Sequence, residues 1–435
     1  MAIQQQRLGR PFWRLWWASG ISGSGDGLVA VALPLLTVTM TRNPLLIAGV
    51  TAVYKASAAV TSLPAGVLAD RVDRRLMMMG CNLVAGAALV LLVVAMLLGV
   101  MDLAMVYLVA VVLAVCGVAY TLAMQACFPD VVSSPELLTE ANGRLIAVQG
   151  AGEQFLGPGS GGVLFALSRK LPFFLDSVSF FVAAWLVKIA IPPARSRGLH
   201  AAPALLRVPA GDDRPAAPGL HWRRRPSLTS DLADGWRLFR RQPALKLLAA
   251  VVASVSFTQS IVFGLLVLYG TRTLHLGSSG YGLFLAFASS FGVAGAFSAG
   301  RLQRRFGTAR LIVGGCALAA VSYLGMAFTH VAVLAVFMFG LQEIGVAVSN
   351  VGSVTVRQRL IPRKVYGRVA SIHRLIVTGA APVGAVLGGV IASVSSVPTA
   401  LLVAGALETV MLVLLAPLLM RALAAERNLV PVPSG

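Results

Sequence analysis

Twelve apolar runs, each about long enough to cross a lipid bilayer, make up most of this 435-residue sequence. A membrane-spanning helix needs about 20 mostly apolar residues. Only 12% of the residues are charged, whereas a soluble protein carries about 25%. We therefore exclude a soluble protein and expect an all-α membrane protein, with twelve transmembrane helices in two six-helix bundles. The runs lie at residues 13–40, 45–69, 76–100, 102–126, 143–168, 172–191, 245–271, 279–300, 309–328, 331–356, 368–394 and 398–423.

A polar, proline-rich stretch separates the sixth run from the seventh. Its composition is typical of a linker rather than of a membrane span. We expect residues 1–191 to form an N-terminal bundle and residues 192–244 to form a cytoplasmic linker. Residues 245–435 then form a C-terminal bundle with a short cytoplasmic tail.

The formal net charge of +20 has two interpretations, a surface for a polyanion or a set of cytoplasmic loops. If the N-terminus lies inside, 29 of the 36 Lys and Arg residues fall in cytoplasmic segments and 4 in external loops. Cytoplasmic loops of membrane proteins carry such an excess. We therefore expect a multi-pass protein of a bacterial inner membrane, with both termini in the cytoplasm. The expected partners are the lipid bilayer, protons and a small molecule, with no nucleic acid, and the chain is expected to be a monomer.

Two landmarks of the fifth run recur in the eleventh. Asn142-Gly143-Arg144 precedes Pro158, and Tyr366-Gly367-Arg368 precedes Pro382. Both landmarks are separated by 224 residues from their counterparts. Internal repeats of this kind are typical of transporters built from two related bundles.

The loop after the second run carries a glycine, an acid and a basic cluster: Gly66, Asp70, Arg71, Arg74 and Arg75. This segment resembles the G-x-L-a-D-r-x-G-r-k signature of the major facilitator superfamily, with an aspartate at position 73 where the family usually has glycine. The resemblance implies that Asp70 is a latch on the cytoplasmic face, that Arg74 and Arg75 support it, and that Arg368 is its counterpart. The alternative is a basic loop that only sets the topology.

The fifth run contains Gly157, Pro158, Gly161 and Gly162. The four residues of the fifth run match the G-P-x-x-G-G-x-L core of the antiporter motif of that superfamily. This match implies export. The alternative is close helix packing, since glycine lets backbones approach and proline kinks a helix. The arginine that the family carries in its fourth helix is missing. The N-terminal pattern, with Arg10 and Arg14 before the first run and then Ser22-Gly23, Gly25-Asp26-Gly27 and Pro34, resembles bacterial exporters of the macrolide-efflux and enterobactin type.

Ionisable residues inside membrane spans are costly, so each is a candidate for function. Asp26 and Glu153 are the first candidates for proton coupling, because burial favours the neutral form of a carboxyl group. Either acid could instead be structural. The remaining candidates are Lys55, Glu343 and Arg374 for coupling, and Ser22, Gln149, Gln259, Gln342 and Asn350 for the lining of a cavity.

The expected function is proton-coupled efflux of an amphipathic small molecule, such as a drug, secondary metabolite or siderophore, by alternating access. A nutrient importer or a lysophospholipid flippase of the same fold is the alternative, and a non-transporting membrane sensor is a third class. The sequence contains no GxxxxGK[ST], GxSxG or HExxH motif, so we expect neither an ATP-driven pump nor an enzyme. We expect no cofactor and no metal site.

Overall fold

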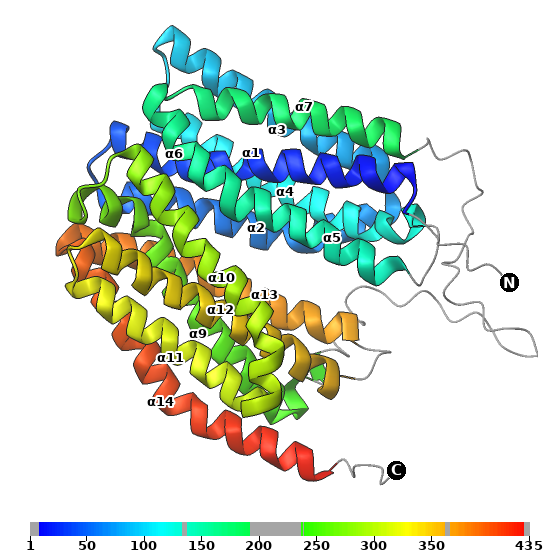
Figure 1. The fold of residues 1–435 in the computed structure, drawn as a ribbon, viewed down its shortest axis with the longest axis vertical. Coiled ribbons are helices and arrows are strands. Elements are labelled where there is room, and N and C mark those ends of the chain that lie inside the picture. Colours follow the sequence, from blue (N-terminus) through cyan, green and yellow to red (C-terminus); the bar gives the residue numbers. More distant parts are fainter. Residues whose placement is uncertain (1–7, 133–136, 192–235, 238, 362–365, 430–435) are drawn as a thin grey trace, which may run out of the picture.

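The computed structural model describes residues 8–132, 137–191, 236–237, 239–361 and 366–429. These residues form helices and no strands (Figure 1). The first bundle contains α1 (Arg10–Met40), α2 (Pro44–Arg71), α3 (Arg74–Leu98), α4 (Leu103–Val131), α5 (Leu138–Gly150), η2 (Ala151–Leu156), α6 (Gly157–Leu167) and α7 (Leu171–Ala190). The second contains α9 (Pro243–Leu268), η4 (Tyr269–Thr273), α10 (Ser278–Phe306), α11 (Thr308–Phe328), α12 (Ala332–Leu360), α13 (Tyr366–Val394) and α14 (Val397–Leu429).

Eleven helices in the described part of the chain are long and apolar enough to cross a membrane. The one remaining predicted span is the fifth in the sequence, residues 143–168. It corresponds to α5, η2 and α6, which follow one another without a break. The prediction of an all-helical protein with two six-helix bundles is therefore confirmed. The sequence pattern did not predict the π-helical turn, η2, that divides the fifth span.

The two bundles join at one end and diverge at the other (Figure 1). α1 begins and α14 ends at the same end of the molecule, which we call the termini end. At the opposite end, the closed end, one hydrophobic core includes Leu36 and Ile47 of the first bundle and Leu265 and Leu401 of the second. Toward the termini end the core divides into clusters that each belong to a single bundle. The hydrophobic attachment between the bundles is therefore concentrated at the closed end.

Glycine contacts at the closed end bring the two backbones together. A Cβ atom on Gly389 of α13 would lie 3.0 Å from the Cα of Leu45 and 3.0 Å from the Cβ of Ala48, both in α2. The Arg272 guanidinium also donates a hydrogen bond across the bundles to the carbonyl oxygen of Arg42, at 3.1 Å. These contacts hold the two bundles together at the closed end.

Most of the predicted linker, residues 192–235 and 238, lies outside the described residues. Its described C-terminal part includes Phe239, which is buried against Leu245, Ile361 and Val369. The chain just before α9 is therefore packed onto the second bundle.

Candidate functional site

The π-helical turn η2 carries Glu153 at the middle of the fifth span. Pro158 lies two residues beyond the end of η2 and has no N–H to donate, so the carbonyl oxygen of Gln154 loses its ordinary helical partner. A π-turn accommodates such an interruption and is frequent at functional sites. Glu153 is exposed, although it lies in the middle of a membrane span.

Asp26 and Lys55 are exposed at the middle of α1 and α2. α1 packs against α7, α6, η2 and α5, and its described residues are mostly buried, so Asp26 lies on one of its few accessible faces. η2, which carries Glu153, packs against α1, which carries Asp26. We call the exposed side chains of Asp26, Tyr54, Lys55 and Glu153 the inner polar surface.

The backbone holds two of these acids at a fixed separation. A Cβ atom on Gly27 would lie 2.8 Å from the carbonyl oxygen of Glu153 and 2.9 Å from the Cα of Gly157. Only glycine allows α1 to approach η2 so closely. The backbone next to Asp26 is therefore packed directly against the turn that carries Glu153.

The candidates of the second bundle are more dispersed. Glu343 is partly exposed, and its Cβ lies 3.3 Å from the position that a Cβ on Gly292 of α10 would occupy. Asn350 and Arg374 are exposed, whereas Gln149 of the first bundle and Gln259 of α9 are partly exposed.

Two of the residues expected to line a cavity, Ser22 and Gln342, are buried between helices in this structure. Their role in lining a cavity stays a prediction. Ser22 lies one turn before Asp26, but a spacing of four residues turns a helix by about 40° beyond a full turn. The boundary between the packed and the accessible face of α1 falls between these two residues.

The basic cluster after α2 binds within its own bundle. Arg74 donates to the carbonyl oxygen of Ala126 at 2.8 Å, and Arg75 donates to that of Lys188 at 3.0 Å. Both carbonyls lie near the C-terminal ends of their helices, where the helix dipole favours a cation. These arginines therefore tie the start of α3 to α4 and α7.

Position 73, where the family usually has glycine, caps α3. The Asp73 carboxylate accepts a hydrogen bond from the backbone N–H of Arg75 at 2.9 Å, as an N-cap residue does. The side chains of Asp70, Arg71 and Arg368 lie outside the described residues, so the latch stays a prediction. Gly66 is open, with nothing within 4 Å of the position that its Cβ would take.

The glycines of the antiporter-like motif are packing positions. A Cβ on Gly157 would lie 2.5 Å from the Cα of Gly27, and one on Gly161 would lie 3.0 Å from the carbonyl oxygen of Leu28. Gly162 instead faces the second bundle, where its Cβ would lie 2.8 Å from the Cα of Gly282 in α10. The motif joins α6 to α1 on one side and to α10 on the other.

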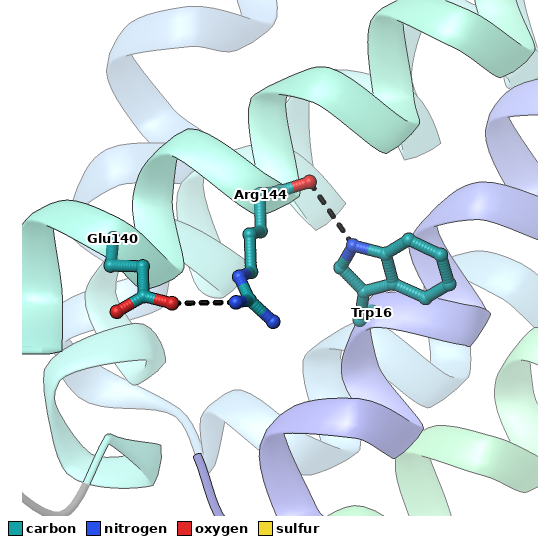
Figure 2. Close-up of polar contacts among 3 residues, drawn as sticks. All are labelled: Trp16, Glu140 and Arg144. Carbon is teal, nitrogen blue, oxygen red and sulfur yellow. Dashed lines mark hydrogen bonds and ion pairs between the residues drawn. The ribbon is translucent and has the colours of Figure 1, made fainter. Parts of the chain in front are cut away.

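A polar and aromatic contact that the sequence analysis missed joins α5 to α1 at the termini end. Arg144 binds Glu140 at 2.6 Å, and the Trp16 indole N–H donates to the Arg144 carbonyl oxygen at 3.1 Å (Figure 2). The Arg144 guanidinium also lies 5.4 Å from the ring centroid of Trp13. The recurrence of the Asn142-Gly143-Arg144 landmark was the sequence signal that could have pointed to this contact.

Two buried acids also received no role from the sequence. Asp176 in α7 accepts a hydrogen bond from Ser179 at 2.8 Å, and Glu408 in α14 accepts one from Thr258 at 2.9 Å. In the described part of the chain, no group of three His, Cys, Asp or Glu residues is arranged to hold a metal ion.

Three solved structures that this chain resembles are those of transporters. A search of curated proteins returns no significant match. A bacterial homologue of the human lysosomal transporter Spinster, solved in an inward-facing and occupied conformation, is 15% identical, with a TM-score of 0.69 over 97% of this chain and 98% of that chain. A bacterial homologue of the iron transporter ferroportin, in an inward-facing state, is 20% identical, with a TM-score of 0.65 over 94% of this chain and 100% of that chain. A variant of the nucleoside transporter NupG is 12% identical, with a TM-score of 0.67 over 95% of this chain and 100% of that chain.

At these identities the structural likeness establishes the fold, and the sequence profile establishes the family. The profile of the Major Facilitator Superfamily matches residues 15–372 and 300–434, which together span nearly the whole chain. The chain is a multi-pass membrane protein that belongs to the Major Facilitator Superfamily.

Proposed function

We propose that this chain is a secondary active transporter that expels an amphipathic small molecule from a bacterial cell in exchange for protons. The observation that supports the proposal is the inner polar surface, in which Asp26, Lys55 and Glu153 are exposed at the middle of their membrane spans. Ionisable residues at this depth are typical of ion and substrate pathways. We further propose that the protein acts as a monomer in the inner membrane, and that residues 192–244 link the bundles on the cytoplasmic side.

The coupling step is a proton transfer at Glu153. In its ionised form the Glu153 carboxylate attracts Lys55, and protonation removes that attraction. A bundle arrangement stabilised by the ion pair therefore loses stability when the proton binds. Alternation between two arrangements then links proton entry to substrate exit.

Two features support the direction and the topology. The excess of positive charge in the segments at the termini end supports a cytoplasmic location for that end, so this conformation would be open to the cell interior. The motif around Gly157 and Pro158 resembles that of exporters. In this orientation Asp70 and Arg368 would meet when the termini end closes.

Everted membrane vesicles test the proposal. Vesicles containing the full chain are energised and supplied with a panel of antibiotics, amphipathic dyes and siderophores, and both substrate movement and internal pH are recorded. We expect the wild-type protein to exchange protons for at least one compound, and Glu153→Gln to fold normally but to lose that exchange. Asp102→Asn is the matched control, because Asp102 is an exposed acid that caps α4 through a hydrogen bond that asparagine can also accept.

The alternatives predict different results in the same vesicles. A nutrient importer moves substrate in the opposite direction, and a flippase moves a lipid analogue between leaflets rather than a soluble compound between compartments. A sensor moves none of them. Normal proton exchange by Glu153→Gln would show that Glu153 is not the coupling residue.

A further inference from the structure

A small pocket lies at the closed end of the first bundle, between the loop that joins α3 to α4 and the loop that joins α6 to α7. Its volume is about 290 Å³, near the lower end of the range of about 300–1,000 Å³ for ligand sites. It is lined by Leu36, Met96, Gly99, Met101, Arg169 and Lys170. Leu36 and Asp26 are separated by about 15 Å along α1, so the pocket is distinct from the inner polar surface.

The pocket combines two cations with an otherwise apolar lining. Arg169 is exposed and Lys170 is partly exposed. In the part of the chain that the structure describes, neither side chain forms an ion pair or donates a hydrogen bond. The acid nearest to the pocket in sequence is Asp102, whose Oδ1 accepts a hydrogen bond from the backbone N–H of Met105 at 2.8 Å. The two positive charges are therefore available to a ligand.

The topology of the chain does not account for these cations. Arg169 and Lys170 are two of the four Lys and Arg residues that the expected topology places in external loops, where positive charge is normally scarce. They follow the C-terminal end of α6, whose dipole favours a cation, but neither side chain donates to the last carbonyl oxygens of that described helix. α7 begins at Leu171 without a side-chain cap, and the N-terminal end of a helix attracts anions. The loop therefore favours an anionic ligand.

The surface beside the pocket is apolar and exposed. Leu98 and Val100 flank Gly99 in the first loop, and Leu167 precedes the second loop; all three side chains are exposed. In a membrane protein such a surface lies against lipid chains. A free phosphate ion would contact the cations alone, whereas a phospholipid would also cover the apolar side chains. The arrangement therefore matches an amphipathic anion.

We propose that this pocket binds an anionic phospholipid, with its phosphate between Arg169 and Lys170 and its acyl chains against Leu98, Val100 and Leu167. A guanidinium group can donate two parallel hydrogen bonds to a phosphate, and an ammonium group binds it as a point charge. The pocket is large enough for the headgroup only, so the chains remain in the bilayer. The inference goes beyond the proposed transport function, because it assigns a lipid partner to the closed end.

Native mass spectrometry of the full-length protein in detergent tests the proposal without any transport substrate. Phosphatidylglycerol is added in increasing amounts to the wild type and to the double variant Arg169→Gln/Lys170→Gln, and the dissociation constant of the first bound lipid is measured. We expect the double variant to bind about 10- to 30-fold more weakly, since two cations that attract the headgroup are lost. Arg169→Gln alone, at an exposed position, should weaken binding about 5-fold, and it provides the comparison if the double variant does not keep the melting temperature of the wild type.

Arg42→Gln is the matched control. Arg42 is an exposed cation of the same end that does not line the pocket, and its carbonyl oxygen, which accepts the Arg272 hydrogen bond, is kept in the variant. We expect this variant to bind phosphatidylglycerol as the wild type does, and phosphatidylcholine with the same acyl chains to bind more weakly to all variants. Unchanged binding by the pocket variants, or an equal loss in Arg42→Gln, would overturn the proposal. Equal binding of phosphatidylcholine, or displacement of the lipid by free glycerol 3-phosphate at similar concentration, would also overturn it.

Discussion

Gly162 of α6 is the position where a single added methyl group should shift the conformational equilibrium of the two bundles. In the structure its Cβ would lie 2.8 Å from the Cα and 2.9 Å from the N of Gly282, and would overlap with the carbonyl oxygen of Ser278. All three atoms belong to the backbone of α10. Because backbone atoms cannot rotate away as a side chain does, Gly162→Ala must separate α6 from α10.

The size of the effect follows from the geometry. Carbon atoms pack at about 3.5–4.0 Å, so the helices must separate by roughly 1 Å. Overpacking of this kind costs about 1–3 kcal/mol. The penalty applies only in the conformation in which α6 packs on α10. It should therefore shift the equilibrium toward the conformation in which these helices are apart by about 5- to 150-fold. The higher helix propensity of alanine acts on both arrangements and cancels.

The assay measures the distance across the closed end. Spin labels are attached at Arg169→Cys and His330→Cys, which are exposed positions in loops of the two bundles, in a background without the native cysteines. We expect Gly162→Ala to add a population with a longer distance. Gly159→Ala is the matched control, because its Cβ would lie 3.4 Å from the Cβ of Ala286, an ordinary contact.

Two results of the distance measurement would refute the argument. Distance distributions that are identical in wild type, Gly162→Ala and Gly159→Ala would refute the argument that this contact holds the closed end together. A shift in Gly159→Ala as large as that in Gly162→Ala would also refute it, because the effect would then not depend on the backbone overlap.

Three further perturbations test the local contacts. In a double-mutant cycle of Glu153→Gln and Lys55→Gln, thermal unfolding in detergent should reveal a coupling of about 0.2–1 kcal/mol, as for an exposed ion pair; strict additivity would argue against the pair. Pro158→Ala restores a backbone donor, so we expect hydrogen exchange to show a more regular helix across η2, while the vesicle assay shows reduced exchange. Arg75→Gln removes the charged donor to the Lys188 carbonyl oxygen and should lower the free energy of unfolding by about 1 kcal/mol, measured by denaturant titration.

The sequence was sufficient for the fold because apolar length alone identifies membrane spans. It was not sufficient for the fifth span, since periodicity does not distinguish an α-turn from a π-turn within one apolar run. The loss of a donor at Pro158 indicated a kink, but not that Glu153 would lie inside a π-turn.

The sequence predicted the individual residues of the candidate site, but not which of them lie near one another. Asp26, Lys55 and Glu153 could be identified individually, because a charge in a membrane span is conspicuous. Which charges meet depends on helix neighbours, and the sequence does not say that α7 packs on α1. The sequence analysis therefore assigned no role to Asp176, which the structure places against Gly25 of α1.

The position of Glu153 suggests how protonation and the closed end communicate. The π-turn that carries Glu153 leads directly into Gly157, which packs on Gly27 of α1, and then into Gly162, which packs on Gly282 of α10. A change in the charge of Glu153 that tightens or relaxes η2 also alters the register of the following residues, because they form one continuous helix. Those residues form one of the contacts between the bundles, so the proposed proton site and this contact lie within a few turns of one another. On this view the glycines of the motif are needed for packing and for coupling at once, because the same close approach that lets α6 contact α10 makes that contact sensitive to small movements of η2.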